Sequence, residues 1–159
     1  MRSGRRDVGC DLERALADTE RNREHWHTLR CLEALAELSA ARGEFDSCEH
    51  FADRLLGLAA AGEMRECIAL AHRWRGEAYR GRKMYAQAVE SFQAAAALAN
   101  DVGRVRLQWD IERALAGAYR EQRVSDLAEQ HKAAARLFAD RIARDLEGSE
   151  LTFETAVVN

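Results

Sequence analysis

The sequence has no proline and only ten glycines among its 159 residues. Proline breaks helices because it lacks a backbone N–H donor, so its absence permits long, uninterrupted helices. Lysine is nearly absent as well: Lys83 and Lys132 are the only two, and arginine supplies the remaining basic charge. We interpret this arginine bias as typical of a GC-rich bacterial genome.

A strong net charge of one sign is also missing. The 24 basic and 27 acidic side chains leave a formal net charge of −3. Nucleic acids and anionic membranes are bound through strong basic fields, so this balance argues against both as partners. No run of about eighteen apolar residues occurs, and no apolar stretch of signal-peptide length follows the basic N-terminal residues. We therefore expect a cytoplasmic protein.

Motifs for catalysis or metal binding are absent from the sequence. The four cysteines form no CxxC pair, and the five histidines form no HExxH motif. No glycine-rich nucleotide-binding loop occurs, and no serine or cysteine has a histidine arrangement that would activate it. The acidic side chains mostly have arginines three or four residues away, as on solvated helix faces. We expect no enzyme activity, no cofactor and no metal.

The residues that are abundant favour helices. Alanine, leucine, glutamate and arginine dominate the chain, and all four are good helix formers. Apolar side chains follow the i, i+3, i+4 spacing of an amphipathic helix, as in Leu32, Leu35 and Ala36, and no alternating run of strand length competes. The length and hydrophobic content fit one domain with a continuous core.

The sequence repeats itself at an interval of forty residues. Tyr79 and Tyr119 lie in the matching contexts GEAYR and AGAYR, and this interval defines units at 29–68, 69–108 and 109–148. Three columns of mostly small side chains and one column of large apolar side chains recur across the units: Ala36, Gly76 and Ala116; Cys48, Ala88 and Ala128; Leu55, Ala95 and Ala135; and Leu58, Leu98 and Phe138. This pattern is typical of helical hairpins that bury their apolar faces only by stacking on one another.

Each unit divides into two amphipathic helices around a polar turn. We expect turns within units near 42–44, 81–83 and 122–124, and turns between units near 61–62 and 101–103. Gly43 and Gly81 suit helix C-terminal caps, and Asp46 and Ser125 suit the N-caps of the following helices.

Residues 10–24 have the register of a second helix from a preceding unit. Leu12 and Ala15 occupy the positions that Ala52 and Leu55 occupy forty residues later. Such a half-repeat either caps the stack or docks on another copy or on further repeats, and the sequence leaves both open. Trp26 is expected to cover the seam between the half-repeat and the first unit, and Trp74 and Trp109 are expected in the core.

The predicted fold is thus all-α: a superhelix of stacked antiparallel helix hairpins with about seven helices. We expect one domain at residues 10–155, after a flexible N-terminus at 1–9, with a C-terminal tail at 149–159.

The second unit resembles a tetratricopeptide repeat. The family pattern of small, aromatic and alanine positions is matched by Gly76, Tyr79, Tyr85, Ala88, Phe92 and Ala95. The first unit follows the pattern less closely, and the third departs from it at Lys132, where the family has an aromatic. The family's common unit has about 34 residues, so the longer interval resembles the subfamily with extended units.

The end of the chain is similar to a narrower group. The segments RLQWDIERALAGAYR and IARDLEGSELTFETA resemble the C-terminal ends of large bacterial signal-transduction ATPases, some with adenylate-cyclase-like or LuxR-type output domains. The proline usual in the tail motif is missing near Glu147 and Gly148. The resemblance implies a scaffold or sensor module that binds a protein or peptide within a regulatory protein.

In tetratricopeptide arrays the first helix of each unit lines a concave groove, through positions two, five, nine and twelve of the unit. The resemblance assigns these positions to Arg30, Glu33, Glu37 and Ala40; to Leu70, Arg73, Glu77 and Arg80; and to Asp110, Arg113, Gly117 and Arg120. Arg73 recurs as Arg113, and Arg80 recurs as Arg120. These arginines would clamp a carboxylate or an acidic segment, because guanidinium groups bind carboxylates bidentately.

The sequence leaves several alternatives to an acidic ligand open. The acidic groove residues would neutralise the arginines if they pair with them. Self-assembly through the half-repeat end, with a homo-oligomer as the result, is an alternative to peptide binding, and a small-molecule sensor is a third, less favoured one.

Overall fold

The structure, a computed structural model, describes the backbone of residues 7–157 and the side chains of residues 7–146. Within this range the chain forms seven α-helices and no strand, which confirms the predicted fold class. The helices are α1 (Val8–Arg21), α2 (His25–Arg42), α3 (Phe45–Ala61), α4 (Arg65–Gly81), α5 (Tyr85–Val102), α6 (Val105–Glu121) and α7 (Ser125–Val157).

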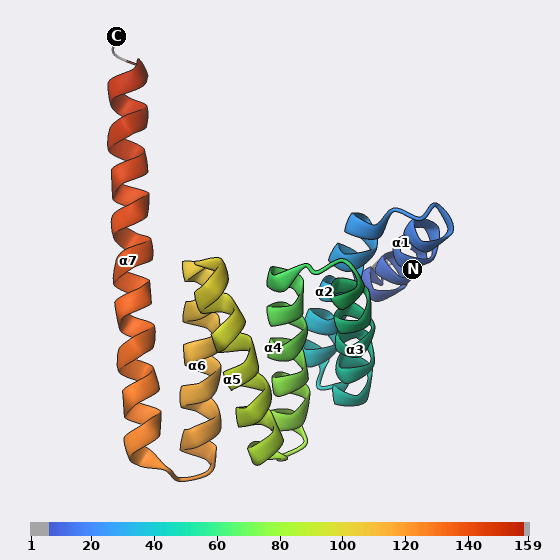
Figure 1. Cartoon of the computed structure of the whole chain (residues 1–159), viewed down its shortest axis with the longest axis horizontal. Coiled ribbons are helices and arrows are strands. Elements are labelled where there is room, and N and C mark those ends of the chain that lie inside the picture. Colours follow the sequence, from blue (N-terminus) through green and yellow to red (C-terminus); the bar gives the residue numbers. More distant parts are fainter. Residues whose placement is uncertain (1–6, 158–159) are drawn as a thin grey trace, which may run out of the picture.

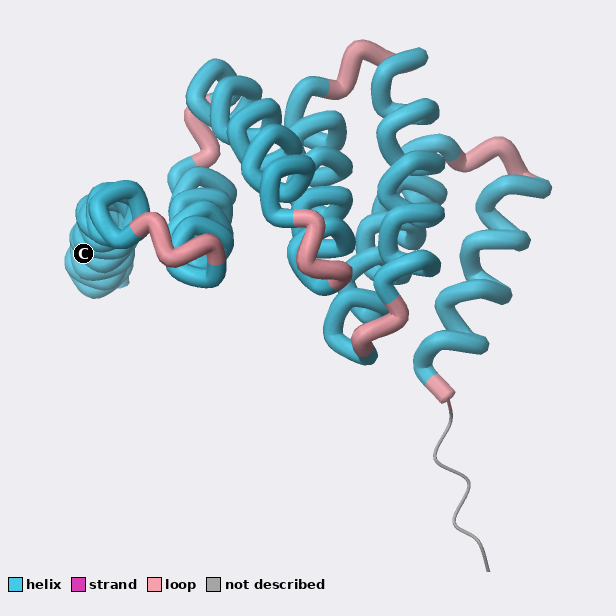
Figure 2. The backbone as a smooth tube through the Cα atoms, turned by 90° about the horizontal axis from the view of Figure 1, so that it is seen from below, coloured by secondary structure: helices cyan, strands magenta, loops and turns pink. Residues whose placement is uncertain are grey.

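The helices stack side by side into a superhelix of antiparallel hairpins (Figures 1 and 2). Each helix packs against the next one in the chain, and α2–α3, α4–α5 and α6–α7 form the three hairpins after α1. The first helices of the hairpins also touch one another, because α4 contacts both α2 and α6. The predicted groove residues therefore lie on neighbouring helices.

The six turns between the helices recur every twenty residues. One residue in each turn has a left-handed backbone, and these residues are Arg23, Gly43, Glu63, Lys83, Gly103 and Arg123. The next helix begins two residues later in every case. Five of the turns are closed by the same 2.9 Å hydrogen bond, as when the Glu44 N–H donates to the Ser39 carbonyl. Each forty-residue repeat therefore consists of two twenty-residue halves, and each half contains one helix and one turn.

This regular turn corrects three of the four expected caps. Gly43 is the left-handed cap of α2, as predicted. Gly81 is instead the last residue of α4, and Lys83 takes the left-handed conformation in that turn. Asp46 and Ser125 lie within the first turn of their helices, because the residue directly after each left-handed position is already the N-cap.

The hairpins begin four residues before the units drawn from the sequence. Helices α2, α4 and α6 start at residues 25, 65 and 105, whereas the predicted units start at 29, 69 and 109. Helix α1 starts at Val8, shortly before the expected domain start at 10, and α7 remains helical through Val157, across most of the expected tail. Residues 1–6 and 158–159, which belong to the expected flexible N-terminus and tail, lie outside the described residues.

The core consists mainly of small side chains between the helices. The small columns predicted from the repeat are buried, except that Ala116 is only half-buried. Phe92 is the largest fully buried side chain, and its ring lies against the backbone of Gly76. A Cβ atom on Gly76 would come within 2.5 Å of the Phe92 ring, so the glycine permits this close approach.

Two of the three tryptophans, Trp74 and Trp109, are expected in the core, and the prediction holds fully for Trp74 and partly for Trp109. Trp74 is buried in the core, and its carbonyl accepts a hydrogen bond from the Cys48 thiol at 3.4 Å. Burial raises the pKa of Cys48 to about 12, so this thiol stays protonated. Trp109 is half-buried. Trp26 is 56% exposed, and it shares a side of α2 with Arg30, one turn further on.

Candidate binding pocket

In the first two hairpins, acidic groove residues pair with groove arginines, which is one of the alternatives that the sequence leaves open. Arg30 pairs with Glu33 at 2.6 Å, and Arg80 pairs with Glu77 at 2.8 Å. Further along, Asp110 lies 4.0 Å from Arg106, a more exposed arginine outside the predicted groove set. Pairs three or four residues apart on one helix contribute only a few tenths of a kcal/mol each, roughly 0.3–0.5.

Glu33 is the groove carboxylate most affected by its surroundings. Burial raises its pKa, with the neighbouring exposed carboxylate of Glu37 acting in the same direction. The positive charges of Arg30 and Arg73 act in the opposite direction, but burial is the larger cause. The folded protein therefore favours the protonated form of Glu33 more than the unfolded chain does.

Replacing Glu33 with glutamine should raise the free energy of unfolding at pH 7 and change it little at pH 4. Because the folded pKa lies above the usual 4.5, the stability that Glu33 contributes is present below that pH and is lost as pH rises through the folded pKa. Glutamine cannot titrate, so its advantage should appear only on the neutral side. Urea unfolding at both pH values measures this, and a variant less stable at pH 7 would show that the Arg30 pair dominates instead.

Three other groove arginines are not neutralised in this way. The Arg73 guanidinium lies 4.1 Å from the centre of the Trp74 ring, and that of Arg113 lies 4.6 Å from the Trp109 ring. These are cation–π contacts, which leave the positive charge in place. Among the described residues, no carboxylate lies within ion-pair distance of Arg73, Arg113 or Arg120.

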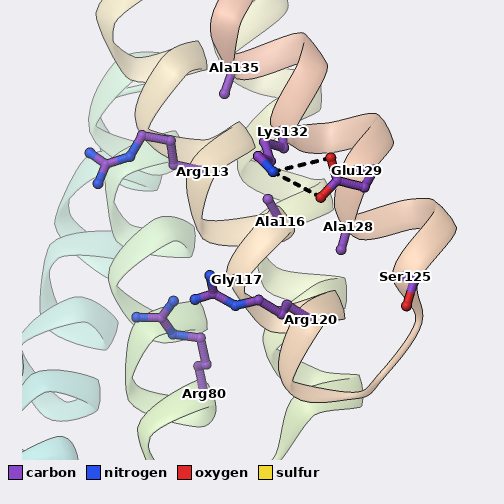
Figure 3. A pocket seen from close by; sticks show the side chains of 10 residues that line it. All are labelled: Arg80, Arg113, Ala116, Gly117, Arg120, Ser125, Ala128, Glu129, Lys132 and Ala135. Atoms are coloured by element: carbon purple, nitrogen blue, oxygen red, sulfur yellow. Dashed lines mark hydrogen bonds and ion pairs between the residues drawn. The ribbon is translucent and has the colours of Figure 1, made fainter.

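A basic pocket of about 430 Å³ lies between α4, α6 and α7 (Figure 3). Its lining comprises four cations, one carboxylate and five small side chains or glycine: Arg80, Arg113, Arg120 and Lys132; Glu129; and Ala116, Gly117, Ser125, Ala128 and Ala135. Lys132 and Glu129 pair at 2.9 and 3.2 Å. Figure 3 shows the side chains of Arg80 and Arg120 reaching toward one another, and Arg113 extending away from Lys132.

The backbone of α6 allows Arg80 to enter this pocket. A Cβ atom on Gly117 would lie 2.7 Å from a guanidinium nitrogen of Arg80, so the guanidinium rests on bare helix backbone. Of the predicted groove residues, the pocket brings together Arg80, Arg113, Gly117 and Arg120. Arg73 is not part of the lining, so the predicted set of four arginines is only partly assembled. The Arg30, Glu33 and Glu37 positions on α2 are also outside it.

Lys132 and Glu129 are site residues that the sequence pattern does not predict. Lys132 was visible only as a departure from the repeat, at the position held by Ala52 and Phe92 in the first two units. In the second hairpin the Phe92 ring fills the space over Gly76. In the third, the Lys132 side chain is 50% exposed and Ala116 is half-buried, so the corresponding space is part of the pocket.

A second hollow of about 420 Å³ adjoins the first and shares Arg80 with it. Its lining mixes Lys83 and Arg80 with Glu77 and Glu121, so it has no excess of either charge. It also contains Ala40 of the predicted groove set. The excess of positive charge thus belongs to the first pocket, which we call the basic pocket.

The outward side of α1 is mostly polar. Leu16 faces the core and is buried, whereas Asp11, Glu13, Arg14 and Asp18 are exposed. Val8 is an exposed apolar residue at the start of this helix. A polar outer face is what a terminal cap of a repeat stack presents, so these residues favour the cap over docking at this end.

Within the described part of the chain, no three or more His, Cys, Asp or Glu side chains are grouped to hold a metal ion. No helix there has the length and apolar character needed to cross a membrane. Comparison of the chain with protein-family models and with curated proteins gives no match.

Proposed function

We propose that this chain is a non-catalytic binding module that takes an acidic segment of a protein or peptide in the basic pocket. The observation that carries this proposal is the set of four cations around the pocket, Arg80, Arg113, Arg120 and Lys132. Arg80 and Lys132 each pair with a carboxylate of their own helix, whereas Arg113 and Arg120 have no carboxylate partner among the described residues. Guanidinium groups bind carboxylates through paired hydrogen bonds, so an acidic ligand is complementary to this lining.

The sequence pattern supports the same proposal. The second unit resembles a tetratricopeptide repeat, a family that binds peptides and proteins, and the chain end resembles the repeat arrays of bacterial signal-transduction regulators. On this proposal the chain is a scaffold or sensor part of such a regulator. Self-assembly is a weaker proposal, because the outward side of α1 is mostly polar.

Replacing Arg80 and Arg120 together with glutamate should weaken binding of a synthetic oligoglutamate peptide at least about tenfold, a loss of about 1.4 kcal/mol. Both guanidinium groups would become carboxylates in the pocket lining, which turns attraction into repulsion. Fluorescence anisotropy of the labelled peptide measures the dissociation constant, and capture from cell lysate with both proteins then identifies natural partners.

The matched control replaces Arg14 and Arg21 of α1 with glutamate. These arginines are exposed and outside the pocket lining, and the change in net charge is the same. The control should bind the peptide like the wild type. An equal loss in both variants would mean that overall charge, and not the basic pocket, attracts the peptide.

A further inference from the structure

We infer that the basic pocket is the seat of a partner's helix, and that this helix presents acidic side chains toward the arginines of α6. The inference rests on the proposed function and specifies the form in which the acidic segment binds. The inference is based on how the first helix of each hairpin packs on the second helix of the hairpin before it.

The second helix of each hairpin carries a row of side chains on which the following first helix packs. The row on α5 is fully buried in one cluster with Leu107, Ile111 and Leu115 of α6, and it consists of Ala88, Phe92, Ala95 and Ala99. The row on α3 is buried in two clusters that include Trp74 and Ala71 of α4, and it consists of Cys48, Ala52, Leu55 and Ala59. A packed first helix is therefore the normal occupant of such a row.

The same row recurs on α7, forty residues after the row on α5. It consists of Ala128, Lys132, Ala135 and Ala139. The first three of these residues line the basic pocket, together with Ala116, which corresponds to Gly76 under the Phe92 ring. Ala128 and Ala135 are already buried in the hairpin that α7 forms with α6, whereas Lys132 is 50% exposed. Within the described residues, no first helix of a following hairpin packs on this row, so the basic pocket is an open seat for such a helix.

The chain that directly follows the row does not turn back to cover it. Helices α3 and α5 end at Ala61 and Val102, and the chain then reverses at Glu63 and Gly103. Helix α7 continues through the corresponding positions to Val157, which carries the backbone roughly 24 Å further at the helical rise. Figure 1 shows this extension running past α6. On this inference, the seat takes a helix of another chain.

The lining determines which helix fits the seat. Ala116 and Ala128 have small side chains, which let another backbone approach closely. Lys132 stands where α5 has the apolar Phe92, so the incoming helix meets a cation at that point. Arg113 and Arg120 are seven residues apart on α6, about 10.5 Å along its axis. A helix lying alongside with glutamates seven residues apart matches both, so charge complementarity selects an acidic helix.

Three synthetic peptides with the sequence of Val105–Glu121 test this inference, because α6 already has the apolar face that packs on such a row. In the acidic probe Arg113 and Arg120 are both replaced by glutamate, and in the neutral probe by glutamine. The third probe is the acidic one with Leu115→Pro, which breaks the helix and keeps the charge. Isothermal titration calorimetry measures each dissociation constant, and circular dichroism follows helix formation on binding.

The acidic probe should bind at least about tenfold more tightly than the neutral probe and at least about tenfold more tightly than the proline probe. Equal binding of the acidic and proline probes would overturn the helix seat while leaving an acidic ligand in place. Binding of neither acidic probe would also overturn the seat, and the oligoglutamate and lysate experiments would then decide the proposed function separately.

Variants of Lys132 test whether the acidic probe binds at the seat. Lys132→Glu should weaken the acidic probe about tenfold, and Lys132→Phe should remove most of the preference for the acidic over the neutral probe. Both should remain folded, because the Lys132 side chain is 50% exposed. Unchanged affinities in both variants would overturn the inference. So would light scattering that shows the wild type forming oligomers disrupted by Lys132→Glu, since a second copy would then occupy the seat.

Discussion

Replacing Phe92 with alanine should lower the free energy of unfolding by about 3–5 kcal/mol. The ring is fully buried, lies on the backbone of Gly76 and packs in one cluster with α6. Alanine would leave a cavity between α4, α5 and α6, where rigid helix backbones cannot close in. Urea unfolding followed by circular dichroism measures the change.

Lys132→Ala is the matched control for Phe92→Ala at the corresponding position of the third hairpin. It should change the free energy of unfolding by less than about 0.5 kcal/mol, because the side chain is 50% exposed and pairs only with Glu129 on its own helix. If the seat on α7 is open, the loss in the free energy of unfolding should be large at Phe92 and small at Lys132. Similar losses at Phe92 and Lys132 would mean that the third hairpin is packed like the second.

The second large effect is expected at Gly81, where alanine should lower the free energy of unfolding by about 2 kcal/mol. A Cβ atom there would lie 2.1 Å from the Phe45 ring, far inside van der Waals contact. The ring is partly buried and packs against a cluster of α2, α3 and α4 residues, so moving it away would cost packing. The loss should largely disappear when Phe45 is also replaced by alanine.

Lys83→Gly separates this explanation from the capping role expected of Gly81. Lys83 has the left-handed backbone of the turn, so glycine there should leave the free energy of unfolding unchanged or raise it by up to about 1 kcal/mol. If Gly81→Ala remains costly without the Phe45 ring, crowding by that ring is not the reason for the glycine.

The sequence predicted the helical hairpins because their small and large positions repeat visibly, as in the column of Ala36, Gly76 and Ala116. It did not show the twenty-residue half-period. Four of the six left-handed turn residues carry side chains, so glycine does not mark these turns. The prediction that Gly81 caps its helix is wrong for a related reason. The role of Gly81 is to make room for Phe45, and local sequence does not reveal that contact.

Only part of the pocket lining could be predicted from the sequence. Arg80, Arg113 and Arg120 stood out because arginine recurs at the inner positions of successive units. Arg73 shares that pattern but lies over Trp74, outside the pocket lining. Lys132 joins the lining because no described first helix follows α7 and packs on its row, and this depends on the course of a helix rather than on residue spacing.

An NMR titration of the isotope-labelled chain with the acidic helical probe locates the binding site of that probe. The largest changes in backbone amide shifts should fall on Ala116, Gly117, Ala128 and Lys132, which line the basic pocket. Smaller changes should extend along α6 and the first part of α7. Changes confined to α1 and α2, or none at probe concentrations that saturate the calorimetric titration, would contradict the helix seat.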